Sequence, residues 1–298
     1  MPVHGGRVYV RINGRLDGTV PPLVMIHDGP GGNIAGLLNA LALSDERAVI
    51  FYDQLDSGRS DHPNNPAYWT VERFADEVDG LRRALGVKRW HVFGHGWGGA
   101  IALEYGSRRP PELAGLVLAS PLISTRSWVE DANALRRTLS ANVRHILERC
   151  DPRAPAPIRP PPRPQEAVCE GAMAAFDAAF NRREPRTGAE LDFLRRGRGV
   201  QFNHLLHDTM WGSSEFVPTG TLKGYDGEPL LLKLNGPSTL FIAGQYDRTR
   251  AVTLARFAQR VPHAQFVTVA GAAHEFLSDN PENSLDILRS WLWTQDSA

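Results

Sequence analysis

Short apolar runs bounded by glycine are the feature that most constrains how this chain can fold. Four of these runs lie in the first 120 residues, at 23–26, 48–52, 90–93 and 116–119. Between them lie helical patterns, such as 71–85, where apolar residues recur at helical spacing before Gly86. Runs of this length suit strands that are buried on both faces of a parallel sheet. The alternation of strand and helix therefore predicts an α/β fold with right-handed crossovers.

The strand pattern stops at Pro121 and resumes at Pro237, which suggests an insertion. After the resumption we expect a strand at 239–242, a helix at 251–261, a strand at 265–269 and a final helix. We therefore predict an α/β core formed by residues 1–120 and 236–298, and a mostly helical cap at 121–235. Seven prolines within 152–165 exclude a helix or a central strand there and predict an extended linker.

Composition excludes several classes of protein. Lys+Arg and Asp+Glu are both 33, so the balanced charge argues against a broadly basic nucleic-acid binder. No apolar run reaches ~18 residues, so we expect no membrane-spanning helix, and the first residues lack the pattern of a signal peptide. Two cysteines, Cys150 and Cys169, cannot form a disulfide framework and do not form a CxxC pair. We expect a soluble, cytoplasmic protein.

The segment 93–99, with the sequence FGHGWGG, lies between a predicted strand and a predicted helix. It has the outline of a nucleophile elbow, G-x-S-x-G, in which small residues allow a sharp strand-to-helix turn. The central position is Gly96, which carries no nucleophile. Taken alone, the segment is equally well interpreted as an ordinary glycine-rich turn.

Three further signals follow predicted strands. The loop 27–32, HDGPGG, could supply the Gly29 N–H of an oxyanion hole, with the Trp97 N–H as its second donor. Asp247 and His274 follow two later strands, in the chain order of nucleophile, acid and histidine that α/β-hydrolases use. There the acid orients the imidazole, and the imidazole moves the proton. Each residue alone could be structural, but four ordered signals favour a catalytic site.

Together these residues resemble the proline iminopeptidase family, serine peptidases of the α/β-hydrolase fold that cleave N-terminal residues. The similar segments are HDGPG at 27–31, FYDQ and SGRS within 51–60, GHGWGG at 94–99, and the stretch 210–222. The resemblance implies a mostly parallel central sheet with an inserted helical cap. It also implies that Asp247 is the triad acid, that His274 is the base, and that Glu215 binds substrate. Because no His, Cys or Asp cluster has metal-ligand spacing, no metal or organic cofactor is expected.

The chain departs from the family pattern at three positions. Gly96 stands where the family has its nucleophilic serine, and Asp28 stands where the family has a glycine. Arg248 follows the triad acid, where the family's aminopeptidases often have a second glutamate that grips the substrate's ammonium group. An arginine there would repel an amine and could attract a carboxylate.

Three functions remain open from the sequence. The favoured one is a hydrolase of a small aminoacyl, amide or ester substrate, or of a short peptide, with hydrolysis compromised by Gly96. The second is a non-covalent lyase, epimerase or direct-water hydrolase, with the His274–Asp247 pair as general base. The third is a non-catalytic binding protein. Ser120 is a poor alternative nucleophile, and we expect Gly96→Ser to restore the triad. The sequence predicts no nucleic-acid or membrane partner. It indicates neither the oligomeric state nor whether Gly96 is natural or engineered.

Overall fold

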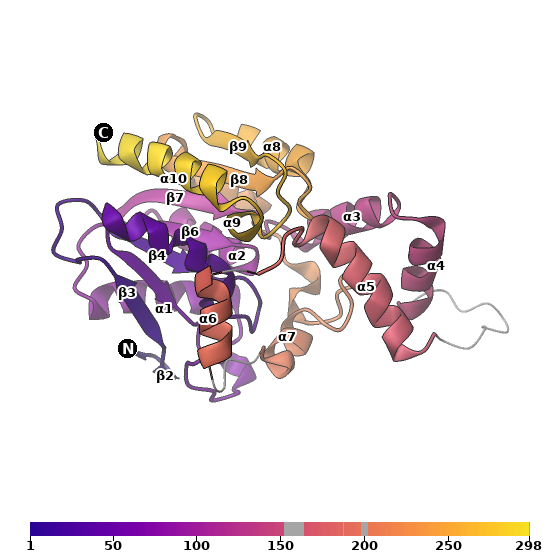
Figure 1. Cartoon of the computed structure of the whole chain (residues 1–298). Coiled ribbons are helices and arrows are strands. Elements are labelled where there is room, and N and C mark those ends of the chain that lie inside the picture. Colours follow the sequence, from indigo (N-terminus) through magenta and orange to yellow (C-terminus); the bar gives the residue numbers. More distant parts are fainter. Residues whose placement is uncertain (152–163, 187, 198–201, 298) are drawn as a thin grey trace.

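The computed structural model describes residues 1–151, 164–186, 188–197 and 202–297 (Figure 1). Its centre is a seven-stranded sheet of order β3-β5-β4-β6-β7-β8-β9, in which only the edge strand β3 runs antiparallel to its neighbour. The strands are β3 (Val10–Asn13), β4 (Leu23–Ile26), β5 (Val49–Tyr52), β6 (Trp90–His95), β7 (Leu113–Ala119), β8 (Thr239–Gly244) and β9 (Gln265–Val269). A small hairpin, β1 (Pro2–Val3) and β2 (Gly6–Arg7), precedes them. The predicted α/β fold with a mostly parallel sheet is confirmed.

Helices cover both faces of this sheet. One face packs on α1 (Val71–Ala84), α2 (Trp97–Ser107) and α8 (Ala251–Gln259). The other packs on η1 (Ile34–Asp45), α9 (Phe276–Asp279) and α10 (Pro281–Asp296). Along β4, Val24 and Ile26 enter the first core, whereas Leu23 and Met25 enter the second. Burial on both faces is therefore the reason that these strands read as unbroken apolar runs.

The segment between β7 and β8 is mostly helical where it is described. It contains α3 (Thr125–Arg136), α4 (Ala141–Cys150), α5 (Glu166–Phe180), α6 (Gly188–Arg196) and α7 (His204–Met210). Three short 3-10 turns follow, η3 (Thr221–Gly224), η4 (Glu228–Lys233) and η5 (Gly236–Ser238), and another, η2 (Pro66–Tyr68), lies earlier in the chain. In Figure 1, α3, α4 and α5 extend to the right of the sheet. The exact boundaries of core and cap stay a prediction. Most of the predicted linker, residues 152–163, lies outside the described residues.

A disulfide between Cys150 and Cys169 joins α4 to α5. This bond could not be expected from the sequence, because two cysteines 19 residues apart belong to no recognised paired motif. The joined helices enclose a small apolar cluster that includes Leu147 and Phe176. No helix in the described part of the chain is both long and apolar enough to cross a membrane.

The parallel strands direct the chemistry-bearing loops to one edge of the sheet. Asp28 follows β4, Gly96 follows β6, Asp247 follows β8 and His274 follows β9. The carboxyl ends of parallel strands meet at the same edge, which is where open α/β sheets bind ligands. Four segments that are distant in the sequence are therefore adjacent in space.

Candidate active site

The turn from β6 to α2 is sharp. Gly96 is the single residue between strand and helix, and it adopts φ 54° and ψ −115°. This left-handed φ favours glycine. A Cβ on Gly98 would collide with the backbone oxygens of Ile26 and His27, so glycine also allows the helix to approach β4 closely. The segment thus has the backbone form of a nucleophile elbow.

Asp28 occupies the space beside Gly96. An ideal Cβ built on Gly96 would overlap Oδ1 and Cγ of Asp28. Asp28 Oδ1 accepts hydrogen bonds from the Gly29 N–H at 2.8 Å and the Trp97 N–H at 2.7 Å. The two amides that the sequence predicted as an oxyanion hole therefore do point to one place. That place is filled by a carboxylate of the chain itself, a contact that sequence analysis did not predict.

His274 and Asp247 form the expected pair. His274 Nδ1–H donates to Asp247 Oδ1 at 2.9 Å, and both side chains are buried. Asp247 also accepts from the Gly244 N–H at 3.1 Å, the Thr249 N–H at 2.8 Å and the Ser120 hydroxyl at 2.5 Å. Ser120 is therefore a hydrogen-bond partner of the acid. These contacts fix the Asp247 carboxylate and, through it, the ring of His274.

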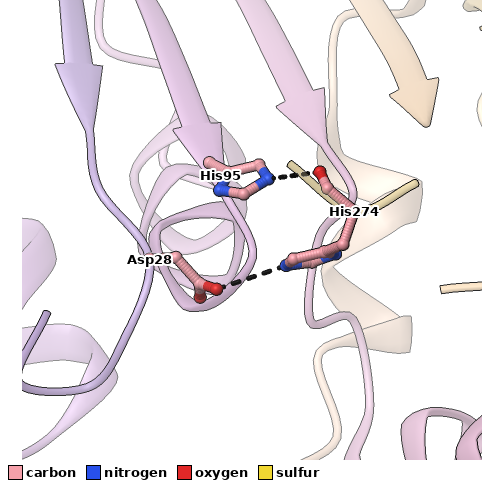
Figure 2. A group of neighbouring side chains, drawn as sticks. All are labelled: Asp28, His95 and His274. Atoms are coloured by element: carbon pink, nitrogen blue, oxygen red, sulfur yellow. Dashed lines mark hydrogen bonds and ion pairs between the residues drawn. The ribbon is translucent and has the colours of Figure 1, made fainter. Parts of the chain in front are cut away.

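The second ring nitrogen of His274 contacts Asp28. His274 Nε2 lies 3.2 Å from Asp28 Oδ2 (Figure 2). Burial lowers the pKa of His274, but Asp247 and Asp28 outweigh it and raise that pKa to about 9. Burial raises the pKa of Asp28, but His274, His95 and the Trp97 amide together hold it well below its usual range. At neutral pH His274 is therefore an imidazolium that pairs with the Asp28 carboxylate.

His95 completes the group. Its Nε2–H donates to the His274 backbone oxygen at 2.9 Å, and the two rings lie 4.6 Å apart, centroid to centroid (Figure 2). Burial and the neighbouring His274 charge lower the pKa of His95 to about 4, so it is neutral. One ligand atom from each of Asp28, His95 and His274 lies within 4.8 Å of the others, a grouping that could accommodate a metal ion. Hydrogen bonds already satisfy both ring nitrogens of His274 and both Asp28 oxygens, so we assign no metal there.

A cavity of about 330 Å³ opens beside this centre. Its lining in the described chain includes Asp28, Trp97, Trp128, Trp211 and Arg248, but neither Gly96 nor His274. The Asp28 side chain is 37% exposed, whereas that of His274 is 1% exposed. Asp28 and His95 are therefore the members of this group that line the cavity, whereas His274 is not part of its lining.

Glu215 and Arg248 also line the cavity, but they do not act separately. The Arg248 guanidinium forms an ion pair with the Glu215 carboxylate and lies 5.1 Å from the centroid of the Trp128 ring. The sequence suggested separate roles for these two residues, as an amine anchor and a carboxylate anchor, and gave no sign that they pair with each other. In this arrangement Arg248 neutralises the carboxylate that a ligand amine would need.

Comparisons with known proteins agree with this fold. A family model described as alpha/beta hydrolase fold matches residues 21–281. The proline iminopeptidase of Lactiplantibacillus plantarum is 30% identical over 301 residues, spanning 99% of this chain and 100% of the relative. That of Heyndrickxia coagulans is 29% identical over 292 residues, spanning 97% and 96%. The crystal structure of the Mycobacterium smegmatis proline iminopeptidase superposes with a TM-score of 0.86 at 29% identity, covering 99% of this chain and 97% of that one.

Proposed function

Because this chain belongs to the proline iminopeptidase family of alpha/beta hydrolases, we propose that it hydrolyses a small ligand without an acyl-serine intermediate. Its full-length relatives make it a hydrolase of the aminopeptidase-like kind. One observation carries the proposal: Gly96 stands at the elbow, and the Asp28 carboxylate fills the space that a side chain there would take.

This arrangement compromises the serine route twice. Gly96 has no hydroxyl, and the nearby Ser120 hydroxyl donates to Asp247. The Gly29 and Trp97 amides are also engaged, since both donate to Asp28 Oδ1. A substrate carbonyl would have to displace an ionised carboxylate before these donors could stabilise its oxyanion. Hydrolysis of aminoacyl amides and esters by the family's usual route is therefore expected to be weak.

The charged centre supports catalysis over simple binding. The ion pair of Asp28 with the buried His274 carries a desolvation cost that a pure binding protein would not need. A lyase or epimerase in which His274 deprotonates the substrate gains less support, because that imidazole is not part of the cavity lining. The Glu215–Arg248 ion pair argues against dependence on a free ligand amine.

A fluorophosphonate probe, which labels activated serines, tests this function. We expect no labelling of the native chain and little release of the chromophore from a prolyl chromogenic amide. The Asp28→Gly, Gly96→Ser double variant is the positive control, since it recreates the serine and vacates the space around it. Labelling of the native chain that disappears in Ser120→Ala would refute the proposal.

A further inference from the structure

We propose that Asp28 is the nucleophile of this hydrolase, and that its substrate is an alkylating ligand, an epoxide or a primary alkyl halide. The Asp28 carboxylate attacks the saturated carbon of the ligand and forms an ester, which water then hydrolyses. The inference rests on the proposed function, in that it takes the chain to be a hydrolase that does not use serine.

The position of Asp28 supports this role. Its carboxylate is ionised and lies where the elbow side chain would be, and its side chain is 37% exposed and lines the cavity. Oδ1 is fixed by two amides, which leaves Oδ2, next to His274, as the oxygen that can attack. Its depressed pKa makes Asp28 a poor general base but keeps it ionised as a nucleophile.

The direction of the oxyanion donors selects the kind of substrate. The Gly29 and Trp97 amides both donate to Oδ1 of Asp28. They are therefore placed to stabilise negative charge on that oxygen, which develops when a nucleophile attacks Cγ of an Asp28 ester. If Asp28 attacked the carbonyl carbon of a substrate amide or ester, the carbonyl oxygen of that substrate would also need the Gly29 and Trp97 amides, which Oδ1 of Asp28 already occupies. Attack on a saturated carbon forms no tetrahedral intermediate on the substrate: the charge goes to a halide ion, or to an alkoxide oxygen when an epoxide opens. The Gly29 and Trp97 amides can therefore stay on Oδ1 of Asp28.

In the first step, an electron pair of Asp28 Oδ2 forms a bond to the ligand carbon. The bond from that carbon to the epoxide oxygen or the halogen breaks, and its electrons go to the leaving atom. A halide departs as an anion, whereas the alkoxide formed from an epoxide takes a proton from a water molecule, which leaves as hydroxide. The cavity lining offers the Arg248 guanidinium as a partner for the departing anion, and Trp128 and Trp211 as apolar contacts.

The second step uses His274. Esterification removes the Asp28 charge, which is one of the two that raise the pKa of His274, so the imidazolium loses its proton more readily. The neutral imidazole, still held by Asp247, then takes a proton from water as the water oxygen bonds to Cγ of Asp28. Oδ1 carries the transient negative charge between the two amides. Collapse breaks the Cγ–Oδ2 bond, and the departing alkoxide takes the proton from His274 and leaves as the alcohol.

A trapping experiment tests the first step. The His274→Gln variant, whose melting temperature is checked first, is incubated separately with a terminal epoxide and with a primary alkyl bromide. We expect about one adduct per chain by intact mass, located at Asp28 within the tryptic peptide 16–47. Adding Asp28→Asn should abolish the adduct. Adding Asp17→Asn is the matched control, because Asp17 lies in the same peptide on the surface and should not affect trapping.

A single turnover of the native protein in water enriched in oxygen-18 tests the second step without a variant. The first product should carry no heavy oxygen, and Asp28 should gain one such atom, because water attacks its Cγ. If neither ligand class gives an adduct at Asp28 and no heavy oxygen enters it, the inference is wrong. If turnover then continues without fluorophosphonate labelling, the proposed function survives alone. Turnover that a chelator abolishes, with no adduct, would also overturn the inference and favour a metal at Asp28, His95 and His274.

Discussion

Gly96→Ser alone should not restore a serine hydrolase, contrary to the expectation from the sequence. The new Cβ would collide with Asp28 Oδ1 and Cγ, so the carboxylate would have to leave its place. That movement breaks two charge-assisted hydrogen bonds, to the Gly29 and Trp97 amides, each worth about 1.5–3 kcal/mol. Because Asp28 is partly exposed, we take the lower end and expect a loss of about 3 kcal/mol in unfolding free energy. The positive φ at residue 96 adds about 1–3 kcal/mol of strain.

The double variant Asp28→Gly, Gly96→Ser should behave differently. The serine side chain enters the vacated space beside His274, and both amides become available to a substrate oxyanion. An intact triad contributes several orders of magnitude, so we expect at least about 10³-fold faster hydrolysis of prolyl amides and esters than in the native chain. Initial rates with chromogenic substrates and thermal melting of all three proteins measure the two effects.

A third substitution, His274→Ala, gives the control, because it should return the double variant to the native rate. The reasoning fails if Gly96→Ser alone matches the double variant in rate and stability, since Asp28 would then not obstruct the elbow. It also fails if the folded double variant remains inactive and unlabelled by a fluorophosphonate.

Three further predictions follow from charges and covalent links elsewhere in the molecule. Arg248→Ala frees the Glu215 carboxylate, so calorimetry should show stronger binding of a free-amine ligand relative to its N-acetyl form; equal changes for both would contradict the pairing. Burial raises the pKa of Glu77 to about 8, so the folded state retains a proton that the unfolded state loses above about pH 4.5. The unfolding free energy of the native chain should therefore fall as the pH rises from about 5 to 8. Urea unfolding at several pH values should show a smaller fall for Glu77→Gln, and an equal fall in both proteins would contradict the prediction. Replacing both Cys150 and Cys169 by serine should lower the unfolding free energy by up to ~3 kcal/mol. A reductant should lower the melting temperature of the native chain but not that of this double variant.

The strands could be predicted because burial on both faces leaves a local signal in the sequence. The runs at 23–26 and 265–269 coincide with β4 and β9. β7 begins earlier than the predicted run at 116–119, at Leu113, which is only half-buried and carries a weaker signal. The disulfide left no such signal, because it depends on how α4 and α5 lie against each other.

The backbone of the candidate site and its acid–histidine pair could be predicted from the sequence, but the position of the Asp28 carboxylate beside Gly96 could not. Asp247 and His274, selected by chain order, do form a hydrogen bond, and the Gly29 and Trp97 amides do converge on one point. Their catalytic roles stay predictions. The contact between Asp28 and the elbow requires knowing where a side chain points across two strands. A signal was nevertheless present, since the loss of a hydroxyl at residue 96 coincides with the gain of a carboxylate in the facing loop.

Strand register explains why a carboxylate at residue 28 can replace a side chain at residue 96. β4 and β6 are hydrogen-bonded neighbours, with Ile26 opposite Gly94, so residues 28 and 96 each lie two positions beyond a paired residue. Neighbouring strands are about 4.8 Å apart, and an aspartate side chain is long enough to bring its oxygens across much of that spacing. The oxyanion donors at Gly29 and Trp97 come one from each loop, so they converge between the strands and can serve a group from either side. The fold thus places one point between the strands within reach of two sequence positions, and in this chain the carboxylate found there comes from the loop after β4.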